Sequence, residues 1–221
     1  MIKGFIFDLD GVITDTANLH FKAWKNKVAE LGIDYSVEEN EKLRGLPRRA
    51  TLEAILAMKA PDLHLTDEQI NKLCTEKNDA YIKLLQEEIN EGSLLPGIKR
   101  LLMEAKDEGI KLAIASSSYN APMILEKLGI RELFDYIVYP GDIQKGKPAP
   151  DIFLKAAEGL GLPVDECVAF EDAIAGVLGI KSANMRAVAI TNGSKEDYSD
   201  ADLIYHSTED LDLMEIMKYW A

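Results

Sequence analysis

Hydrophobic residues recur with two different spacings along the chain, and the spacing changes early. Residues 2–7 are almost continuously apolar and end in Asp8-Leu-Asp-Gly11. An unbroken apolar run that stops at a glycine turn is typical of a strand buried on both faces of a parallel sheet. From Ala17 to Leu31 the apolar residues instead follow a helical spacing, which ends at Gly32. This second pattern predicts an amphipathic helix with a left-handed glycine stop.

The helical pattern continues to about residue 90 without any strand-like stretch. A helix is predicted over 48–58, and a longer one begins at Thr66-Asp-Glu-Gln69. That sequence is a capping box, in which Thr and Gln each satisfy a backbone N–H of the first helical turn. Residues 16–91 are therefore predicted to be entirely helical.

After Gly92 the pattern becomes an alternation of strands and helices. Parallel strands require helical crossovers, so this alternation favours a doubly wound, Rossmann-like α/β sheet. We expect a core domain made of residues 1–15 and 92–221, interrupted by an all-helical cap domain over 16–91, with hinges near 14–15 and 92–93. The strands predicted after Gly92 cover 111–115, 136–139, 167–170, 187–190 and 203–205.

The charge and composition of the chain disfavour some classes of binding partner. The 221 residues include 38 acidic and 25 basic side chains, for a net charge of -13. A field of this sign repels polyanions, so we expect neither nucleic acid nor an anionic membrane as a partner. No apolar run reaches the roughly 20 residues that span a bilayer, and no signal-peptide segment precedes Asp8. A cytoplasmic protein with reduced, buried Cys74 and Cys167 is the expectation.

Polar residues cluster where the predicted strands end. In an open α/β sheet, ligands bind beyond the carboxyl ends of the strands. Carboxylates, a hydroxyl and an ammonium at that edge suit phosphoryl transfer assisted by Mg²⁺. Neither a GxGxxG fingerprint after a strand nor a P-loop motif is present, which disfavours dinucleotide and P-loop nucleotide binding. The residues concerned are Asp8, Asp10, Ser116, Lys147, Glu171 and Asp172.

These residues, in this order around a helical insertion, resemble the four motifs of the haloacid dehalogenase-like superfamily with a cap after the first motif. The resemblance spans the whole chain. Within the superfamily the chain is similar to the β-phosphoglucomutase family. The stretches that carry this closer similarity are Asp8-Leu-Asp-Gly-Val-Ile-Thr-Asp-Thr16, His20-Phe-Lys-Ala-Trp24, Arg44-Gly45, Lys77-Asn-Asp79 and Gly146-Lys-Pro-Ala-Pro-Asp151.

The resemblance implies roles for the core residues. Asp8 would accept the phosphoryl group as an aspartyl phosphate, and Asp10 would be the general acid and base. Mg²⁺ would be held by an Asp8 oxygen, the Asp10 backbone carbonyl and Asp172, with Glu171 outside this set or reaching it through water. Ser116 and Lys147 would hold the transferring phosphoryl group.

The resemblance also implies roles for cap residues. Thr16 and His20, one helical turn apart, would help to place Asp10. Arg48 would bind a second, distal phosphate, and Arg49 is the alternative because the two are adjacent. Ser118 and Asn120 would assist Arg48 from the core, and Arg44 and Lys77 would also contact substrate. The chain departs from the family pattern at Arg44, where Lys is common, and at Pro47 and Ala173, where Ser is common.

The function implied is interconversion of β-glucose 1-phosphate and glucose 6-phosphate through a bound 1,6-bisphosphate. The expected partners are therefore small sugar phosphates, and we expect a monomer. The alternative enzyme is a Mg²⁺-dependent sugar-phosphate phosphatase of the same superfamily, which needs only one phosphate site. A third hypothesis is a catalytically silent binding module, against which the intact Asp8, Asp10, Lys147 and Asp172 argue.

Overall fold

A computed structural model describes residues 1–43, 46 and 48–221 of the chain. These residues form two compact units, one made of 1–15 with 89–221 and the other made of 16–88. The first unit contains the sheet and the second is helical.

The first unit is built on one parallel sheet of six strands. The strand order is β3-β2-β1-β4-β5-β6, so the chain moves outward from β1 first in one direction and then in the other. This order confirms the predicted doubly wound, Rossmann-like core with a helical insertion after the first strand. The strands are β1 (Gly4–Phe7), β2 (Lys111–Ile114), β3 (Tyr136–Ile137), β4 (Cys167–Glu171), β5 (Arg186–Ile190) and β6 (Leu203–Tyr205).

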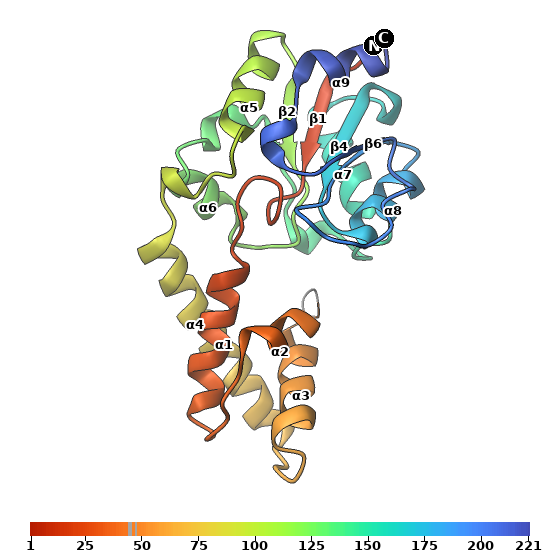
Figure 1. Cartoon of the computed structure of the whole chain (residues 1–221). Coiled ribbons are helices and arrows are strands. Elements are labelled where there is room, and N and C mark those ends of the chain that lie inside the picture. The colour runs from red at the N-terminus through yellow and green to blue at the C-terminus, as the bar shows by residue number, and fades with distance from the viewer. Residues whose placement is uncertain (44–45, 47) are drawn as a thin grey trace. The chain divides into compact units, whose positions relative to one another are not determined.

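Helices cover the sheet on both faces (Figure 1). Small and aliphatic residues on one face, among them Ile6 and Ala169, share a buried cluster with α7 (Asp151–Leu160) and α8 (Ile174–Ser182). The other face carries the aromatic rings of Phe5, Phe7 and Phe170, and Phe7 stacks on Phe170 with ring centroids 4.5 Å apart. Helices α5 (Ile98–Asp107), α6 (Ala121–Lys127) and α9 (Leu213–Tyr219) complete the unit.

The structure differs from the sequence prediction in a few boundaries. Strand β3 ends at Ile137 and not at Tyr139, because its partner β2 ends at Ile114, which is the residue paired with Ile137. Two short helices were not predicted, α9 and α2 (Val37–Lys42). Each begins at a polar N-cap residue, Ser36 or Asp212, and neither is longer than two turns.

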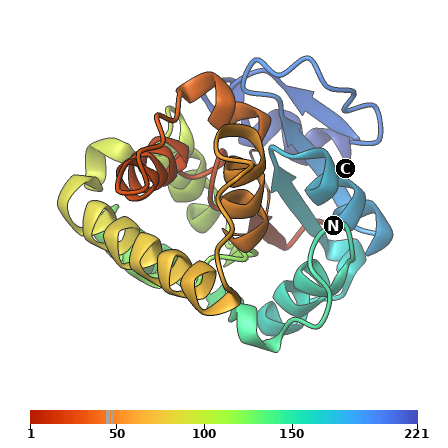
Figure 2. The same cartoon turned by 90° about the horizontal axis from the view of Figure 1, so that it is seen from below.

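The second unit contains α1 (Ala17–Ala29), α2, α3 (Arg48–Lys59) and α4 (Asp67–Glu88). Helix α1 and helix α3 both pack against α4 (Figures 1 and 2). The predicted capping box at the start of α4 is present: Thr66 N–H donates to Gln69 Oε1 at 2.8 Å, and Gln69 N–H donates to Thr66 Oγ1 at 3.2 Å. The unit has its own core, which includes Trp24, Val28, Leu52, Ile55 and Ile70.

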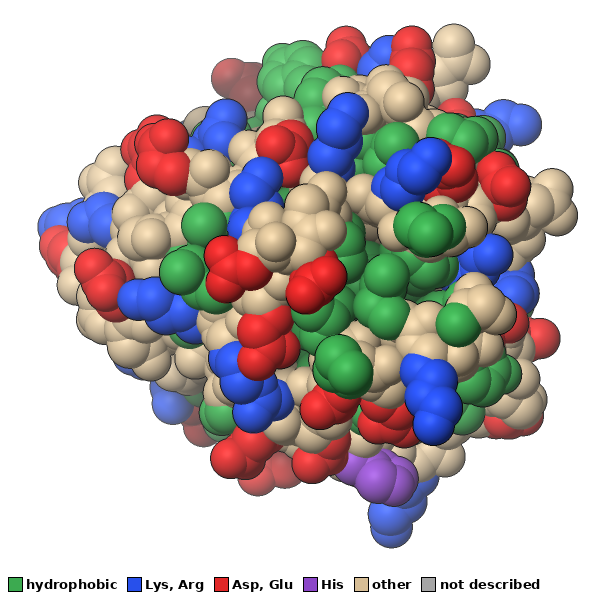
Figure 3. All heavy atoms as spheres, turned by 90° about the horizontal axis from the view of Figure 1, so that it is seen from above, with side chains coloured by type: hydrophobic (Ala, Val, Ile, Leu, Met, Phe, Trp, Pro, Cys, Tyr) green, Lys and Arg blue, Asp and Glu red, His purple; other side chains and the backbone are tan. Residues whose placement is uncertain are grey.

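Two features bear on possible partners. Among the described residues, no helix is both long enough and apolar enough to cross a bilayer. On the face of the molecule shown in Figure 3, the described Lys and Arg side chains are interspersed with Asp and Glu. That face therefore offers no continuous basic surface of the kind that binds nucleic acid.

Candidate active site

The strand register brings the polar strand ends together at one edge of the sheet. Phe7 at the end of β1 pairs with Ile114 of β2 on one side and with Phe170 of β4 on the other. The next residues continue this pairing, since Asp8 N–H donates to the Phe170 carbonyl at 3.0 Å and Ala115 N–H donates to the Phe7 carbonyl at 2.8 Å. Asp8 is thus placed on the central strand, between the chain that leads to Ser116 and the chain that contains Glu171.

Lys147 links two of the carboxylates. Its Nζ donates to Asp8 Oδ1 at 2.8 Å and also to Glu171 Oε1. Burial by itself lowers the pKa of a lysine, but the charges of Asp8 and Glu171 outweigh burial here and raise the pKa of Lys147 above its usual value. Burial raises the pKa of Glu171, against the opposing charge of Lys147. Lys147 is therefore a fixed ammonium beside the Asp8 carboxylate.

The Glu171 carboxylate is satisfied on both oxygens. Oε1 accepts from Lys147, and Oε2 accepts from the backbone N–H groups of Asp172 at 2.9 Å and Ala173 at 3.0 Å. A carboxylate with both oxygens engaged is better suited to orienting its neighbours than to binding a cation directly. Its main effect is to fix Lys147 and the backbone of Asp172.

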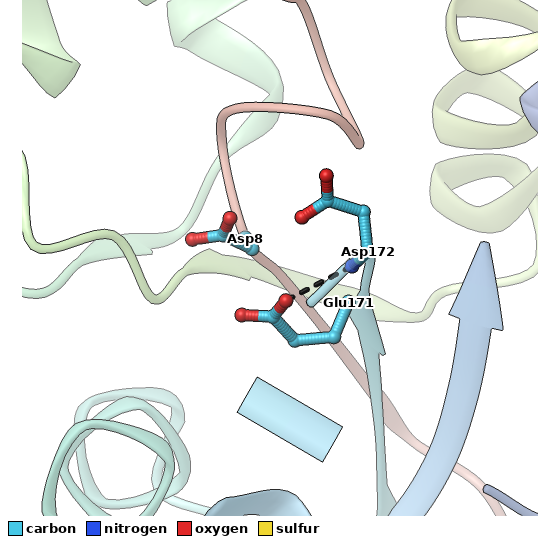
Figure 4. Close-up of side chains that lie close together, drawn as sticks. All are labelled: Asp8, Glu171 and Asp172. Carbon is cyan, nitrogen blue, oxygen red and sulfur yellow. Dashed lines mark hydrogen bonds between the residues drawn. The ribbon is translucent and has the colours of Figure 1, made fainter. Parts of the chain in front are cut away.

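Three carboxylates are close enough to share a cation. One oxygen from each of Asp8, Glu171 and Asp172 lies within 4.8 Å of the other two (Figure 4). Mg²⁺ binds oxygen at about 2.0–2.1 Å, so two ligands of one ion are roughly 3–4 Å apart. The carboxylate oxygens are the ligand type that Mg²⁺ prefers, and they are gathered within 4.8 Å of one another at this edge. The carboxylate of Asp10 is not in this group, and the role predicted for Asp10 in metal binding uses its backbone carbonyl.

The turn after β1 leaves no room for a side chain at Gly11. Gly11 has φ +78°, and a Cβ at this position would lie 1.9 Å from Asp172 Oδ2. Its N–H donates to the Thr14 carbonyl at 2.7 Å, which closes the turn. Glycine is required here because the backbone both adopts a left-handed conformation and contacts the Asp172 carboxylate.

The serine-rich loop after β2 is ordered by its own hydrogen bonds. Ser116 is buried, and its Oγ accepts from Ser118 N–H at 3.1 Å. Ser118 Oγ in turn accepts from Asn120 N–H at 3.2 Å. Ser116 lies two residues after the end of β2, at the edge predicted for a phosphoryl-binding group.

The second unit contains a buried cluster around Lys77. Lys77 is 3% exposed, and its Nζ lies 2.9 Å from His20 Nδ1. The His20 ring stacks on Tyr81 with centroids 3.9 Å apart, and Tyr81 OH donates to Thr16 Oγ1 at 3.1 Å. Helices α1 and α4 therefore bring together three residues that the sequence analysis singled out, Thr16, His20 and Lys77.

The Lys77 cluster shifts two pKa values. Burial, with a smaller contribution from Arg48, lowers the pKa of Lys77 to about 7. Burial and the charges of Lys77 and Arg48 lower the pKa of His20 to about 3. His20 is therefore neutral near pH 7.

The two adjacent arginines of α3 have different partners. Arg49 contacts two carboxylates, Glu53 Oε1 at 2.8 Å and Asp67 Oδ1, and also Asn71 Oδ1 at 3.2 Å. Arg48 instead donates to the neutral amide oxygen of Asn78 at 2.8 Å. An arginine already paired with carboxylates has less to gain from an added phosphate. Arg44 lies outside the described residues.

Two residues that the sequence does not single out contact the predicted site. Asn192 Nδ2 donates to the Gly11 carbonyl at 2.8 Å, and Tyr198 OH donates to the Asp172 carbonyl at 2.6 Å. Both follow β5, outside the four motifs. The sequence contains one relevant signal, the pair Asn192-Gly193 directly after an apolar strand, which is typical of a tight turn.

Comparisons with known proteins agree with this architecture. Residues 2–184 match the family model of the haloacid dehalogenase-like hydrolases. The chain is 44% identical to the β-phosphoglucomutase of Bacillus subtilis over 219 residues, which is 99% of this chain and 96% of that protein. It is 32% identical to the fructose-1-phosphate phosphatase YqaB of Escherichia coli, over 85% of this chain and 95% of the relative.

A similar structure extends the comparison to the fold. The crystal structure of β-phosphoglucomutase from Clostridium difficile has a TM-score of 0.86 and 40% sequence identity, covering 100% of this chain and 97% of that one. The similarity therefore includes both compact units and the insertion of one into the other's sequence.

Proposed function

The chain belongs to the haloacid dehalogenase-like hydrolase family, and we propose that within it the protein acts as a β-phosphoglucomutase. The reaction is the interconversion of β-D-glucose 1-phosphate and D-glucose 6-phosphate through β-glucose 1,6-bisphosphate. The single observation that carries this proposal is the 44% identity to the Bacillus subtilis enzyme along 99% of the chain. Because identity at that level includes the helical unit, it bears on substrate choice as well as on the shared phosphoryl chemistry.

Asp8 is the proposed phosphoryl acceptor. A carboxylate oxygen of Asp8 forms a bond to phosphorus, and the bond between phosphorus and the sugar oxygen breaks, which leaves a phospho-Asp8 and a sugar monophosphate. Its position directly after β1 and its contact with the Lys147 ammonium support this role, because a nearby cation offsets the repulsion between a carboxylate and a phosphate. Ser116 and Lys147 orient the phosphoryl oxygens.

Asp10 is the proposed general acid and base. It donates a proton to the sugar oxygen as the phosphorus–oxygen bond breaks, and it takes a proton from the other hydroxyl of the sugar when that hydroxyl attacks phospho-Asp8. One residue can do both because the two half-reactions are the reverse of one another. Thr16 and His20 are proposed to help to place Asp10.

Mg²⁺ is the proposed cofactor. When bound, it supplies positive charge that lowers the barrier to attack by one anion on another. The residues proposed to hold it are Asp8, Asp172 and the backbone carbonyl of Asp10, with Glu171 fixing their arrangement. The cluster of carboxylate oxygens within 4.8 Å supports this assignment.

A mutase differs from a phosphatase because its intermediate carries two phosphates. Arg48 is the proposed ligand of the second phosphate, with Ser118, Asn120, Arg44 and Lys77 as further contacts. The hydrogen-bond partners of Arg48 and Arg49 favour Arg48 over its neighbour, because among the described residues Arg49 is paired with carboxylates and Arg48 with an amide oxygen. We further propose that the protein acts on these small sugar phosphates as a cytoplasmic monomer.

The alternative activity is hydrolysis of a sugar monophosphate. The 32% identity to a fructose-1-phosphate phosphatase favours this alternative over a binding module, because that relative shares the family and most of the chain. The two enzymes differ in their products. The test is therefore product analysis after incubation with β-glucose 1-phosphate, Mg²⁺ and a trace of the 1,6-bisphosphate. Glucose 6-phosphate is the expected product, whereas glucose with free phosphate would establish a phosphatase.

A further inference from the structure

The segment that follows β5 begins with a tight turn. Ser194 N–H donates to the Thr191 carbonyl at 2.8 Å. The two central residues, Asn192 and Gly193, have φ of +48° and +81°. Positive φ at both central positions is characteristic of a type I′ turn, for which Asn-Gly is the preferred sequence. The turn fixes the backbone from which the Asn192 side chain extends.

Asn192 donates a hydrogen bond to the turn that follows β1, residues 8–11. Its Nδ2 donates to the Gly11 carbonyl at 2.8 Å, while the Gly11 N–H donates to the Thr14 carbonyl at 2.7 Å. Both backbone polar groups of Gly11 are therefore engaged. Because a peptide group is planar, fixing the Gly11 N–H also fixes the direction of the Asp10 carbonyl in the same peptide. Thr14 thus orients the Asp10–Gly11 peptide, and Asn192 orients the Gly11–Val12 peptide that follows it.

Tyr198 likewise donates a hydrogen bond to the loop after β4, which contains Asp172. Its ring is 4% exposed, and its hydroxyl donates to the Asp172 carbonyl at 2.6 Å. The Asp172 N–H donates to Glu171 Oε2 at 2.9 Å. Both backbone polar groups of Asp172 are therefore engaged as well, one by the residue before it and one by Tyr198.

The two segments held in this way are in contact with each other. A Cβ on Gly11 would lie 1.9 Å from Asp172 Oδ2, so the Gly11 backbone cannot move towards Asp172 without displacing its carboxylate. The carboxylates of Asp8 and Asp172 belong to the cluster that fits a cation. A single stretch of chain, 191–198, thus supplies a hydrogen bond to each of the two loops that carry this cluster.

We propose that Asn192 and Tyr198 are positioning residues that set the separation between the Asp8–Gly11 turn and Asp172, and through it the affinity for Mg²⁺ and the rate of phosphoryl transfer. The reaction named here rests on the proposed function. The proposed effect on the separation of Gly11 and Asp172 does not depend on that function, because the contacts of Asn192 and Tyr198 lie within the first compact unit. Neither residue touches the substrate or the ion in this proposal, since both act through backbone carbonyls.

The test uses the full-length variants Asn192→Ala and Tyr198→Phe. Tyr198→Phe removes only a hydroxyl, so it keeps the buried ring and the fold. Mg²⁺ affinity is measured by isothermal titration calorimetry, and kcat and KM are measured with β-glucose 1-phosphate. Loss of a group that orients metal ligands typically costs about 10–100-fold. We expect each variant to bind Mg²⁺ at least about tenfold more weakly, with a fall in kcat larger than any change in KM.

Two matched variants control for stability alone. Asn184 is the other described asparagine with positive φ, at +55°, and it precedes β5 at the opposite end of that strand. Asn184→Ala therefore repeats the loss of a left-handed asparagine without touching Gly11. Tyr205→Phe removes another buried tyrosine hydroxyl, which lies in β6, outside the stretch 191–198. Both controls are expected to bind Mg²⁺ like the wild type, whatever their melting temperatures.

The Mg²⁺ affinities and the product analysis test the positioning role and the proposed function separately. Wild-type Mg²⁺ affinity in both Asn192→Ala and Tyr198→Phe would overturn the proposal, and so would equal weakening in the two control variants. A wild-type protein that binds Mg²⁺ but forms no glucose 6-phosphate would refute the proposed function, and the calorimetric comparison would still decide the role of Asn192 and Tyr198.

Discussion

The backbone of Gly11 lies directly against the carboxylate of Asp172. A Cβ on Gly11 would be 1.9 Å from Asp172 Oδ2, although the two residues are far apart in the sequence. The turn after the first strand and the loop after the fourth are therefore fitted to each other, and the proposed cation site depends on that fit.

Gly11→Ala is expected to weaken Mg²⁺ binding and activity by at least about tenfold, because the added methyl group must push Asp172 away. The same change costs roughly 1–2 kcal/mol of stability through the left-handed backbone. Gly109→Ala is the matched control, since Gly109 has φ +75° and open space around its Cβ position. Equal Mg²⁺ affinity in the two variants, measured by calorimetry, would show that the contact with Asp172 is not restrictive.

Lys77 gives the second unit a pH-dependent stability. Its pKa is about 7 in the folded protein and 10.5 in the unfolded chain, so between these values the unfolded chain binds more protons. Stability therefore rises as pH increases from about 7 towards 10.5. From pH 7 to pH 9 the gain is about 2 kcal/mol, or roughly 5 °C in melting temperature.

Lys77→Met is the comparison for that prediction, because methionine keeps the buried volume without the charge. The melting temperature of the wild type should rise with pH relative to that of Lys77→Met over this range. Parallel curves for the two proteins would mean that Lys77 keeps an ordinary pKa. His20, with a pKa of about 3 against 6.5 when unfolded, should in addition cost stability as pH falls below about 6.5.

Arg48→Ala should lower mutase turnover by about two orders of magnitude, since two charge-assisted hydrogen bonds are worth ~3 kcal/mol or more. Phosphorylation of Asp8 by acetyl phosphate, which has no distal phosphate, should change far less. Arg49→Ala serves as the control and should mainly lower the melting temperature, because Arg49 is bound to Glu53, Asp67 and Asn71. A large loss of turnover in Arg49→Ala alone would assign the distal phosphate to Arg49.

Asp10→Asn should slow transfer from phospho-Asp8 to the sugar by about 10² to 10⁴, the usual contribution of a general acid or base. Formation of phospho-Asp8 from acetyl phosphate is the internal control, because acetate leaves without needing a proton. Single-turnover measurements of the two steps should therefore diverge. A near wild-type transfer rate would move the role to another residue, with His20 the first to be tested.

The positions of the candidate-site carboxylates could be predicted because all strands of a parallel sheet run in the same direction. Once residues 2–7 and 167–170 are recognised as buried strands, their carboxyl ends must meet at one edge, and Asp8 and Glu171 follow them directly. The capping box at Thr66 was equally predictable, since it depends on four consecutive residues.

Contacts made by side chains over long sequence distances could not be predicted in this way. The sequence suggests a turn at Asn192-Gly193, but nothing in it indicates that the Asn192 amide reaches Gly11. The pairing of His20 with Lys77 likewise depends on how α1 packs against α4. The choice between Arg48 and Arg49 depends on their partners in α4, which are Asn78 for Arg48 and Asp67 for Arg49. These contacts arise from packing between elements, which periodicity does not specify.

The central claim is that the phosphoryl group passes through Asp8. The most direct measurement is single-turnover labelling, in which the protein with Mg²⁺ and bisphosphate labelled in both phosphates is quenched in acid and digested. The account predicts label on the peptide that contains Asp8, its transfer to added glucose 6-phosphate, and no label on the Asp8→Ala variant. Label on a different peptide, or appreciable turnover by Asp8→Ala, would contradict it.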